Sequence, residues 1–114
     1  MNRRKELKDA YKTMKADMGV FIIKSNLREI SYIEGTMDLK STINSTKFKL
    51  GMGMHPNKEL QKQWKEYGEA SFTIEILEKL KYDEDETKVD YSEELNILKI
   101  IWQERLSKKG MEFY

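Results

Sequence analysis

Apolar residues near the start of the chain fall into two short runs that predict β-strands. The runs cover residues 19–24 and 30–35, are rich in β-branched and aromatic side chains, and are separated by a largely polar stretch. Such a pair is typical of a hairpin. A third strand is predicted where Phe72, Ile74 and Ile76 alternate with polar residues, because alternation marks a strand with one buried face.

Helical spacing of apolar residues predicts four helices around these strands, at 3–16, 38–50, 57–67 and 91–106. Asp38 and Asn57 are predicted N-caps, and Gly68 is a predicted helix stop. The order α-β-β-α-α-β-α indicates the α+β class, with a small three-stranded antiparallel sheet flanked by helices. The side chains expected to be largely buried are Val20, Ile22, Trp64, Phe72, Ile74, Ile76, Leu98 and Trp102.

Length and composition limit what this chain can be. Its 114 residues suit one domain, 1–114, with the helix at 3–16 as an N-terminal extension. The absence of cysteine excludes disulfides and thiolate chemistry. The first residues are charged with no apolar segment behind them, and no apolar run approaches the roughly 20 residues that span a bilayer. We therefore expect a cytoplasmic protein with no membrane partner.

Charge is unevenly distributed although the net charge is only +1. Residues 83–94 carry seven acids against one lysine, whereas residues 40–65 carry one acid against six lysines. A basic region of this kind can meet phosphate, and the alternative is an ordinary solvated face. The candidate nucleic-acid-binding residues are Lys40, Lys47, Lys49, Lys58, Lys62 and Lys65.

The stretch 55–61, His-Pro-Asn-Lys-Glu-Leu-Gln, is followed by a tryptophan, by Tyr67-Gly68 and by the run at 72–77. This order resembles the GIY-YIG nucleases, over residues 19–114, and in particular small stand-alone bacterial members of the family. The resemblance implies a three-stranded sheet that carries two catalytic tyrosines, an arginine on the next helix, and a glutamate on a later helix that binds one divalent metal. A tyrosine would then help activate water against a phosphodiester.

Four positions depart from that pattern where the chemistry would be done. Phe21 stands in place of the first tyrosine, and it has no hydroxyl to exchange a proton. Thr42 stands in place of the arginine, and Lys99 in place of the metal-binding glutamate, where an ammonium repels a divalent cation. Glu34 occupies the position of the signature glycine, with Gly35 displaced by one residue.

Tyr32 matches the second signature tyrosine, and His55 is the sole histidine, so both are candidate vestigial catalytic residues. The alternatives are a packed strand tyrosine and a histidine that makes a loop hydrogen bond. No metal site is predicted, and Mg²⁺ or Mn²⁺ would be required only if the protein were active. Met52 and Met54, in the loop before His55, are expected to cover the core.

Three functions remain open at this point. The first is a catalytically degenerate nuclease-like protein, a pseudoenzyme with a nucleic-acid-binding or regulatory role such as transcription regulation. Its binding to DNA or RNA is predicted to be weak and non-specific, because arginine is scarce and no aromatic side chains are expected among the lysines. The second is an active metal-dependent endonuclease built on Tyr32, His55 and Glu34. The third is a protein-interaction module, and the oligomeric state stays open in all three.

Overall fold

The centre of the molecule is a mixed sheet, seen in a computed structural model that describes residues 15–114. The predicted helix at 3–16 falls almost entirely outside the described residues. The strands are β1 (Met18–Ser25), β2 (Ile30–Thr36), β3 (Phe72–Leu80) and β4 (Glu112–Phe113), in the spatial order β3-β1-β2-β4. The predicted hairpin and third strand are confirmed, and the fold belongs to the expected α+β class.

Strand β1 is central and pairs antiparallel with both β2 and β3. A β-bulge interrupts its pairing with β3 between Val20 and Phe21. Near the bulge the two backbones approach so closely that a Cβ on Gly19 would lie 2.1 Å from the carbonyl oxygen of Glu78. A larger residue at this position would therefore force the strands apart.

The sequence predicts three strands, whereas the sheet within residues 15–114 has four. The C-terminal segment, for which no element is predicted, forms β4 parallel to the start of β2. The N–H of Tyr114 donates to the carbonyl of Ser31 at 2.9 Å. A two-residue strand is too short to leave a hydrophobic pattern. Because β4 covers only the beginning of β2, the half of β2 from Tyr32 onward is an edge of the sheet.

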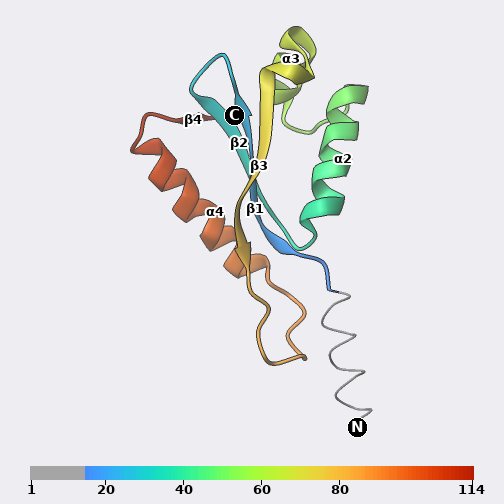
Figure 1. The fold of residues 1–114 in the computed structure, drawn as a ribbon, viewed down its shortest axis with the longest axis vertical. Coiled ribbons are helices and arrows are strands. Elements are labelled where there is room, and N and C mark those ends of the chain that lie inside the picture. The colour runs from blue at the N-terminus through green and yellow to red at the C-terminus, as the bar shows by residue number, and fades with distance from the viewer. Residues whose placement is uncertain (1–14) are drawn as a thin grey trace.

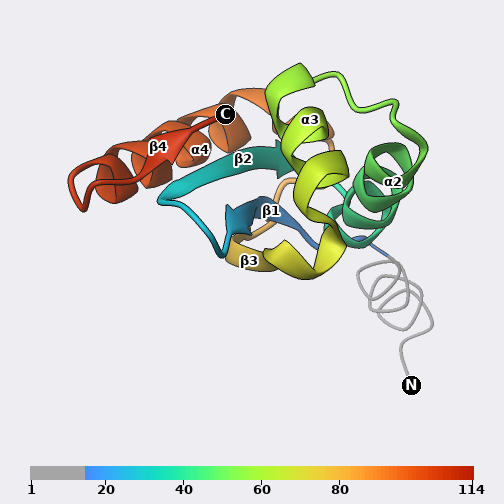
Figure 2. The same ribbon diagram turned by 90° about the horizontal axis from the view of Figure 1, so that it is seen from above.

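Helices cover both faces of the sheet. Helices α2 (Leu39–Met52) and α3 (Lys58–Tyr67) lie on one face, and α4 (Ser92–Ser107) lies on the other (Figures 1 and 2). A short 3₁₀ turn, η1 (Glu69–Ser71), leads into β3. The predicted caps are confirmed: the Asp38 carboxylate accepts from the Ser41 N–H and the Asn57 side chain accepts from the Leu60 N–H. None of the helices within residues 15–114 has the length and apolar character needed to cross a bilayer.

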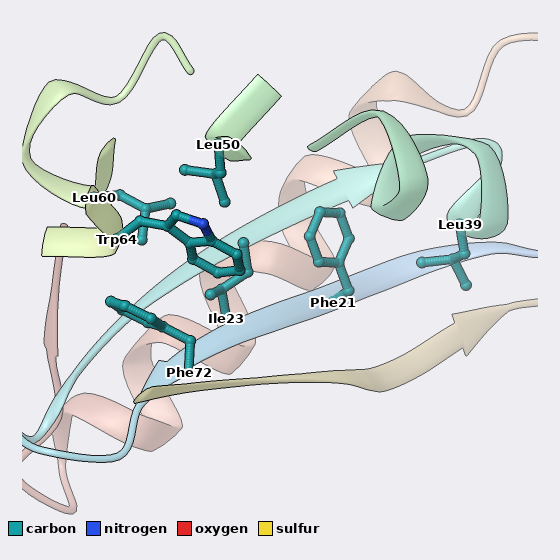
Figure 3. Close-up of a cluster of buried hydrophobic side chains, with 7 residues drawn as sticks. All are labelled: Phe21, Ile23, Leu39, Leu50, Leu60, Trp64 and Phe72. Atoms are coloured by element: carbon teal, nitrogen blue, oxygen red, sulfur yellow. The ribbon is translucent and has the colours of Figure 1, made fainter. Parts of the chain in front are cut away.

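The continuous apolar run of β1 explains the two-sided core. Alternate residues of a strand point to opposite faces, so a strand that is apolar throughout can be buried on both. Phe21 and Ile23 pack under α2 and α3, whereas Val20 and Ile22 pack under α4. Figure 3 shows the first cluster, in which the side chains of Phe21, Ile23, Leu39, Leu50, Leu60, Trp64 and Phe72 fill the space between helices and sheet.

Several residues expected in the core are more exposed than predicted. Ile76 is 47% exposed, because β3 is the outer strand and a hollow of about 550 Å³ lies between Ile76 and α2. Ile74, Leu98 and Trp102 are only partly buried. The prediction that Met52 and Met54 cover the core is wrong: they are 61% and 63% exposed, since Leu50 and Leu60 already fill the space beneath their loop.

Candidate functional site at the open edge of β2

The candidate catalytic residues meet at the part of β2 that β4 leaves uncovered. Tyr32 and Glu34 are two residues apart on this strand, so their side chains share the face beneath α2 and α3. Across the hairpin Tyr32 is paired with Ile23, and Glu34 is paired with Phe21. The phenylalanine that stands in place of the first signature tyrosine is therefore the direct neighbour of the glutamate that stands in place of the signature glycine.

Tyr32 and Glu34 form a hydrogen-bonded pair. The Tyr32 hydroxyl donates to Glu34 Oε1 at 2.5 Å. Partial burial raises the pKa of Tyr32 well above its ordinary value, and the hydrogen bond and the negative charge of Glu34 raise it further. The phenol consequently keeps its proton at neutral pH, which makes Tyr32 a weak general base.

His55 contacts the ring of Tyr32 and is hydrogen-bonded within its own loop. Its ring meets the Tyr32 ring edge-on, with 5.2 Å between centroids. Its Nδ1 accepts from the Asn57 N–H at 3.0 Å, so the interpretation of His55 as a loop histidine with a hydrogen bond is confirmed. Burial lowers the pKa of His55 and a nearby Lys49 lowers it further, against the opposing effect of Glu34. Neutral His55 therefore carries its proton on Nε2.

Gln61 fixes the loop that carries His55. Its side-chain carbonyl accepts from the His55 N–H, and its amide donates to the Leu50 carbonyl, both at 2.9 Å. One side chain of α3 thus ties the end of α2 to the loop before α3. In the sequence Gln61 stands out only as the last residue of the stretch 55–61 that resembles the GIY-YIG nucleases. Its role in fixing the loop is not predicted.

A pocket of about 240 Å³ opens between these residues and α2. Hydroxyl groups dominate its α2 wall, and the Thr42 hydroxyl is hydrogen-bonded to the Thr36 hydroxyl at 2.6 Å. Of the charged side chains that line it, one is a carboxylate, Glu34, and one is an ammonium, Lys49. The full lining is Glu34, Ser41, Thr42, Ser45, Thr46, Lys49, His55 and Pro56. The helical spacing of the four hydroxyl residues is a signal that sequence reasoning left unused.

A second pocket, of about 380 Å³, lies between β2 and α4, and Glu34 borders it as well. Lys99, for which the resemblance implies a metal-binding glutamate, lines this pocket. Gly35 marks the place where α4 packs on β2, since a Cβ there would lie 3.2 Å from the Leu95 carbonyl oxygen. Gly35 therefore lies on the α4 face of the strand, whereas the Glu34 side chain starts from the face that carries Tyr32.

The donor set of these pockets does not suit Mg²⁺ or Mn²⁺. Such ions prefer several carboxylate and water oxygens, whereas both pockets offer Glu34 as their one carboxylate and the second adds the Lys99 ammonium. Within residues 15–114 no three histidine or acidic side chains gather into a group able to hold a metal ion. Phe21, fully buried, adds no ligand atom.

The six candidate lysines lie on α2 and α3, on the face of the sheet opposite α4 (Figure 1). All are exposed, and none forms an ion pair with another residue of the described range. Of the six, Lys49 borders the pocket beside His55, whereas Lys40 and Lys65 border other hollows. The acidic connection between β3 and α4 lies at the other end of the long axis from α3.

Phe48 corrects one expectation about this surface. The sequence prediction places no aromatic side chain among the lysines, yet Phe48 lies between Lys47 and Lys49 and is 65% exposed. Helix α2 buries Leu39, Thr46 and Leu50, which turns position 48 outward. Sequence inspection passes over such a residue because an apolar residue in a helix is ordinarily assigned to the core.

Comparison with known proteins gives a class of fold. The sequence matches no protein-family model and no curated protein. The structure resembles the catalytic domain of the homing endonuclease I-TevI, with a TM-score of 0.65 and 22% identity, over 83% of this chain and 94% of that domain. A point mutant of the same domain matches with a TM-score of 0.65 and 21% identity, over 86% of this chain and 92% of that one. The chain has a GIY-YIG-like fold.

Proposed function

We propose that this protein is a nuclease-fold protein that binds nucleic acid without cleaving it. The observation that carries the proposal is the composition of the pockets beside Glu34. Thr42 and Lys99 line these pockets, and Phe21 is paired with Glu34 on the neighbouring strand. At these positions the resemblance implies a phosphate-binding arginine, a metal-binding glutamate and a catalytic tyrosine, respectively. The fold is retained while each of these chemical groups is replaced.

The geometry argues against hydrolysis on several independent grounds. Glu34 borders both pockets, so its carboxylate would repel a phosphate that entered either one. The Tyr32 phenol keeps its proton, and the Thr42 hydroxyl carries no charge to stabilise an oxyanion. Loss of one such electrostatic donor commonly costs about 10² to 10³ in rate. Several losses together leave little catalysis.

The exposed lysines of α2 and α3 support the binding half of the proposal. No acid within residues 15–114 pairs with them, so all six are available to neutralise phosphates. A structural neighbour is an endonuclease domain, which makes nucleic acid a natural partner class for this fold. Binding without cleavage suits a regulatory role, transcription regulation included.

The binding test measures affinity for DNA and RNA by fluorescence anisotropy at several salt concentrations. Neutralising Lys58, Lys62 and Lys65 together, each to Gln, should weaken binding and lower the salt slope by up to about 2.7, since each duplex phosphate contact contributes about 0.9. A control variant with the same change in charge replaces Lys79, Lys81 and Lys109, which lie off α2 and α3. Equal losses in the two variants, or no binding by the wild type at low salt, would refute the assignment and favour a protein-interaction module.

The cleavage test incubates the purified protein with plasmid and oligonucleotide DNA in Mg²⁺ or Mn²⁺. We expect no cleavage above that of a mock purification. Cleavage that persists through repurification and disappears in Tyr32→Phe would establish an active endonuclease instead.

A further inference from the structure

The outward side of α4 carries apolar residues that the fold leaves uncovered. Ile97, Ile100 and Ile101 are 50%, 51% and 38% exposed. With 3.6 residues per turn they lie opposite the inner stripe of Leu95 and Trp102, which packs on the sheet. The helix is thus apolar on both sides, which is unusual for a surface helix.

Nothing within residues 15–114 covers this outer face. Figure 1 shows α4 alone on its side of the sheet, with α2 and α3 across the sheet from it. Figure 2 shows from above that α4 forms the outer boundary of the molecule there. A row of exposed isoleucines along one helix is the kind of surface that ordinarily meets another protein.

The charges at the two ends of this face indicate what kind of protein would bind there. Glu93 lies in the first turn of α4 and Lys108 directly follows its last turn, both exposed. Both project on the same side as Ile97 and Ile100 by helical spacing. If a second α4 lies antiparallel with its centre between Ile100 and Ile101, then Ile100 faces Ile101 of the second copy. In the same register Glu93 faces Lys108 of the second copy.

We propose that the outer face of α4 is the interface of an antiparallel homodimer of this chain. One two-fold axis brings Ile100 against Ile101 of the second copy at the centre and Glu93 against Lys108 at both ends, and such an isologous contact closes on itself. In this register Ile97 faces Glu104 of the second copy, whose carboxylate lies 3.8 Å from Lys108 Nζ of its own helix. A single pair of helices buries little area, so the association is weak, reversible and dependent on concentration. The lysines of α2 and α3 lie across the sheet from the interface, so the dimer does not depend on the proposed nucleic-acid binding.

The first test is sedimentation velocity of the full chain over micromolar to millimolar concentration. The wild type should shift from the chain mass of 13.6 kDa toward twice that value. Ile100→Glu combined with Ile101→Glu places four carboxylates at the two-fold axis and should stay monomeric throughout. Leu27→Glu is the control for a carboxylate placed elsewhere on the surface, because Leu27 is 59% exposed in the β1–β2 turn, away from α4. This variant should dimerise as the wild type does.

The second test addresses the antiparallel register. Glu93→Lys and Lys108→Glu should each weaken dimerisation by about tenfold or more, and the two changes together should restore it, because they exchange the partners of each pair. Circular dichroism melts confirm that the variants fold; the Glu104–Lys108 ion pair that one of them breaks is exposed and contributes little. A double variant that dimerises as weakly as the single variants would overturn the antiparallel register. A wild type that stays monomeric at every concentration would overturn the dimer and leave the face to a different protein.

Discussion

Replacing Gln61 with alanine tests whether one side chain holds the loop that carries His55. The substitution removes the hydrogen bond from the His55 N–H and the hydrogen bond to the Leu50 carbonyl. The Leu50 carbonyl keeps a long 3.4 Å contact from the Gly53 N–H, whereas the His55 N–H is left without an acceptor in a partly buried place. Two net hydrogen bonds of about 1 kcal/mol each give an expected loss of roughly 2 kcal/mol in the free energy of unfolding.

Urea unfolding followed by circular dichroism measures this loss, and the melting temperature should fall by about 8 °C for a domain of this size. Gln63→Ala is the matched control, because Gln63 lies on the same helix and its amide makes no hydrogen bond within residues 15–114. Gln61→Glu keeps the hydrogen-bond acceptor and loses the donor. Its free energy of unfolding should therefore lie between those of Gln61→Ala and Gln63→Ala. A Gln61→Ala variant within about 0.5 kcal/mol of Gln63→Ala would refute the role assigned to this side chain.

Two further predictions concern His55 and Phe48. Because burial lowers the pKa of His55 in the folded state, the unfolded chain binds more protons below about pH 6.5, and stability should fall as the pH drops from about 7 to about 5. His55→Gln should remove that part of the pH dependence in urea unfolding, and an unchanged pH profile would contradict it. Phe48→Ala should weaken single-stranded DNA binding by about fivefold or more through loss of base stacking, and weaken duplex binding much less, in anisotropy titrations. Equal losses on both forms would show that Phe48 does not stack on bases.

The parts of the fold that the sequence predicts well are those with a local cause. Asp38 and Asn57 cap their helices by hydrogen bonds to N–H groups three residues away, so the signal and the structure lie in the same few residues. The apolar run of β1 likewise predicts a strand from its own residues, although its burial on both faces is seen only in the structure. The sequence also indicates Tyr32, His55 and Glu34 as candidate site residues, and the structure brings them together.

The parts that the sequence does not predict depend on which element lies next to which. Ile76 alternates correctly with its neighbours, yet it is exposed because β3 is an outer strand that α2 covers only in part. Strand β4 exists only because the chain returns to β2 after α4. Phe48 resembles a core residue until the orientation of α2 is known. Periodicity specifies a face of an element but not what covers that face.

Gly35 and Glu34 are neighbours on β2 that face different parts of the molecule. Side chains alternate along a strand, so a glycine moved from position 34 to position 35 moves to the opposite face. At position 35 it leaves room for the Leu95 backbone, and α4 can pack closely on β2. At position 34 the glutamate then projects on the side of Tyr32, where it accepts the phenol hydrogen bond and borders both pockets. Glycine at position 35 and glutamate at position 34 therefore let α4 pack closely on β2 while a negative charge lies beside Tyr32.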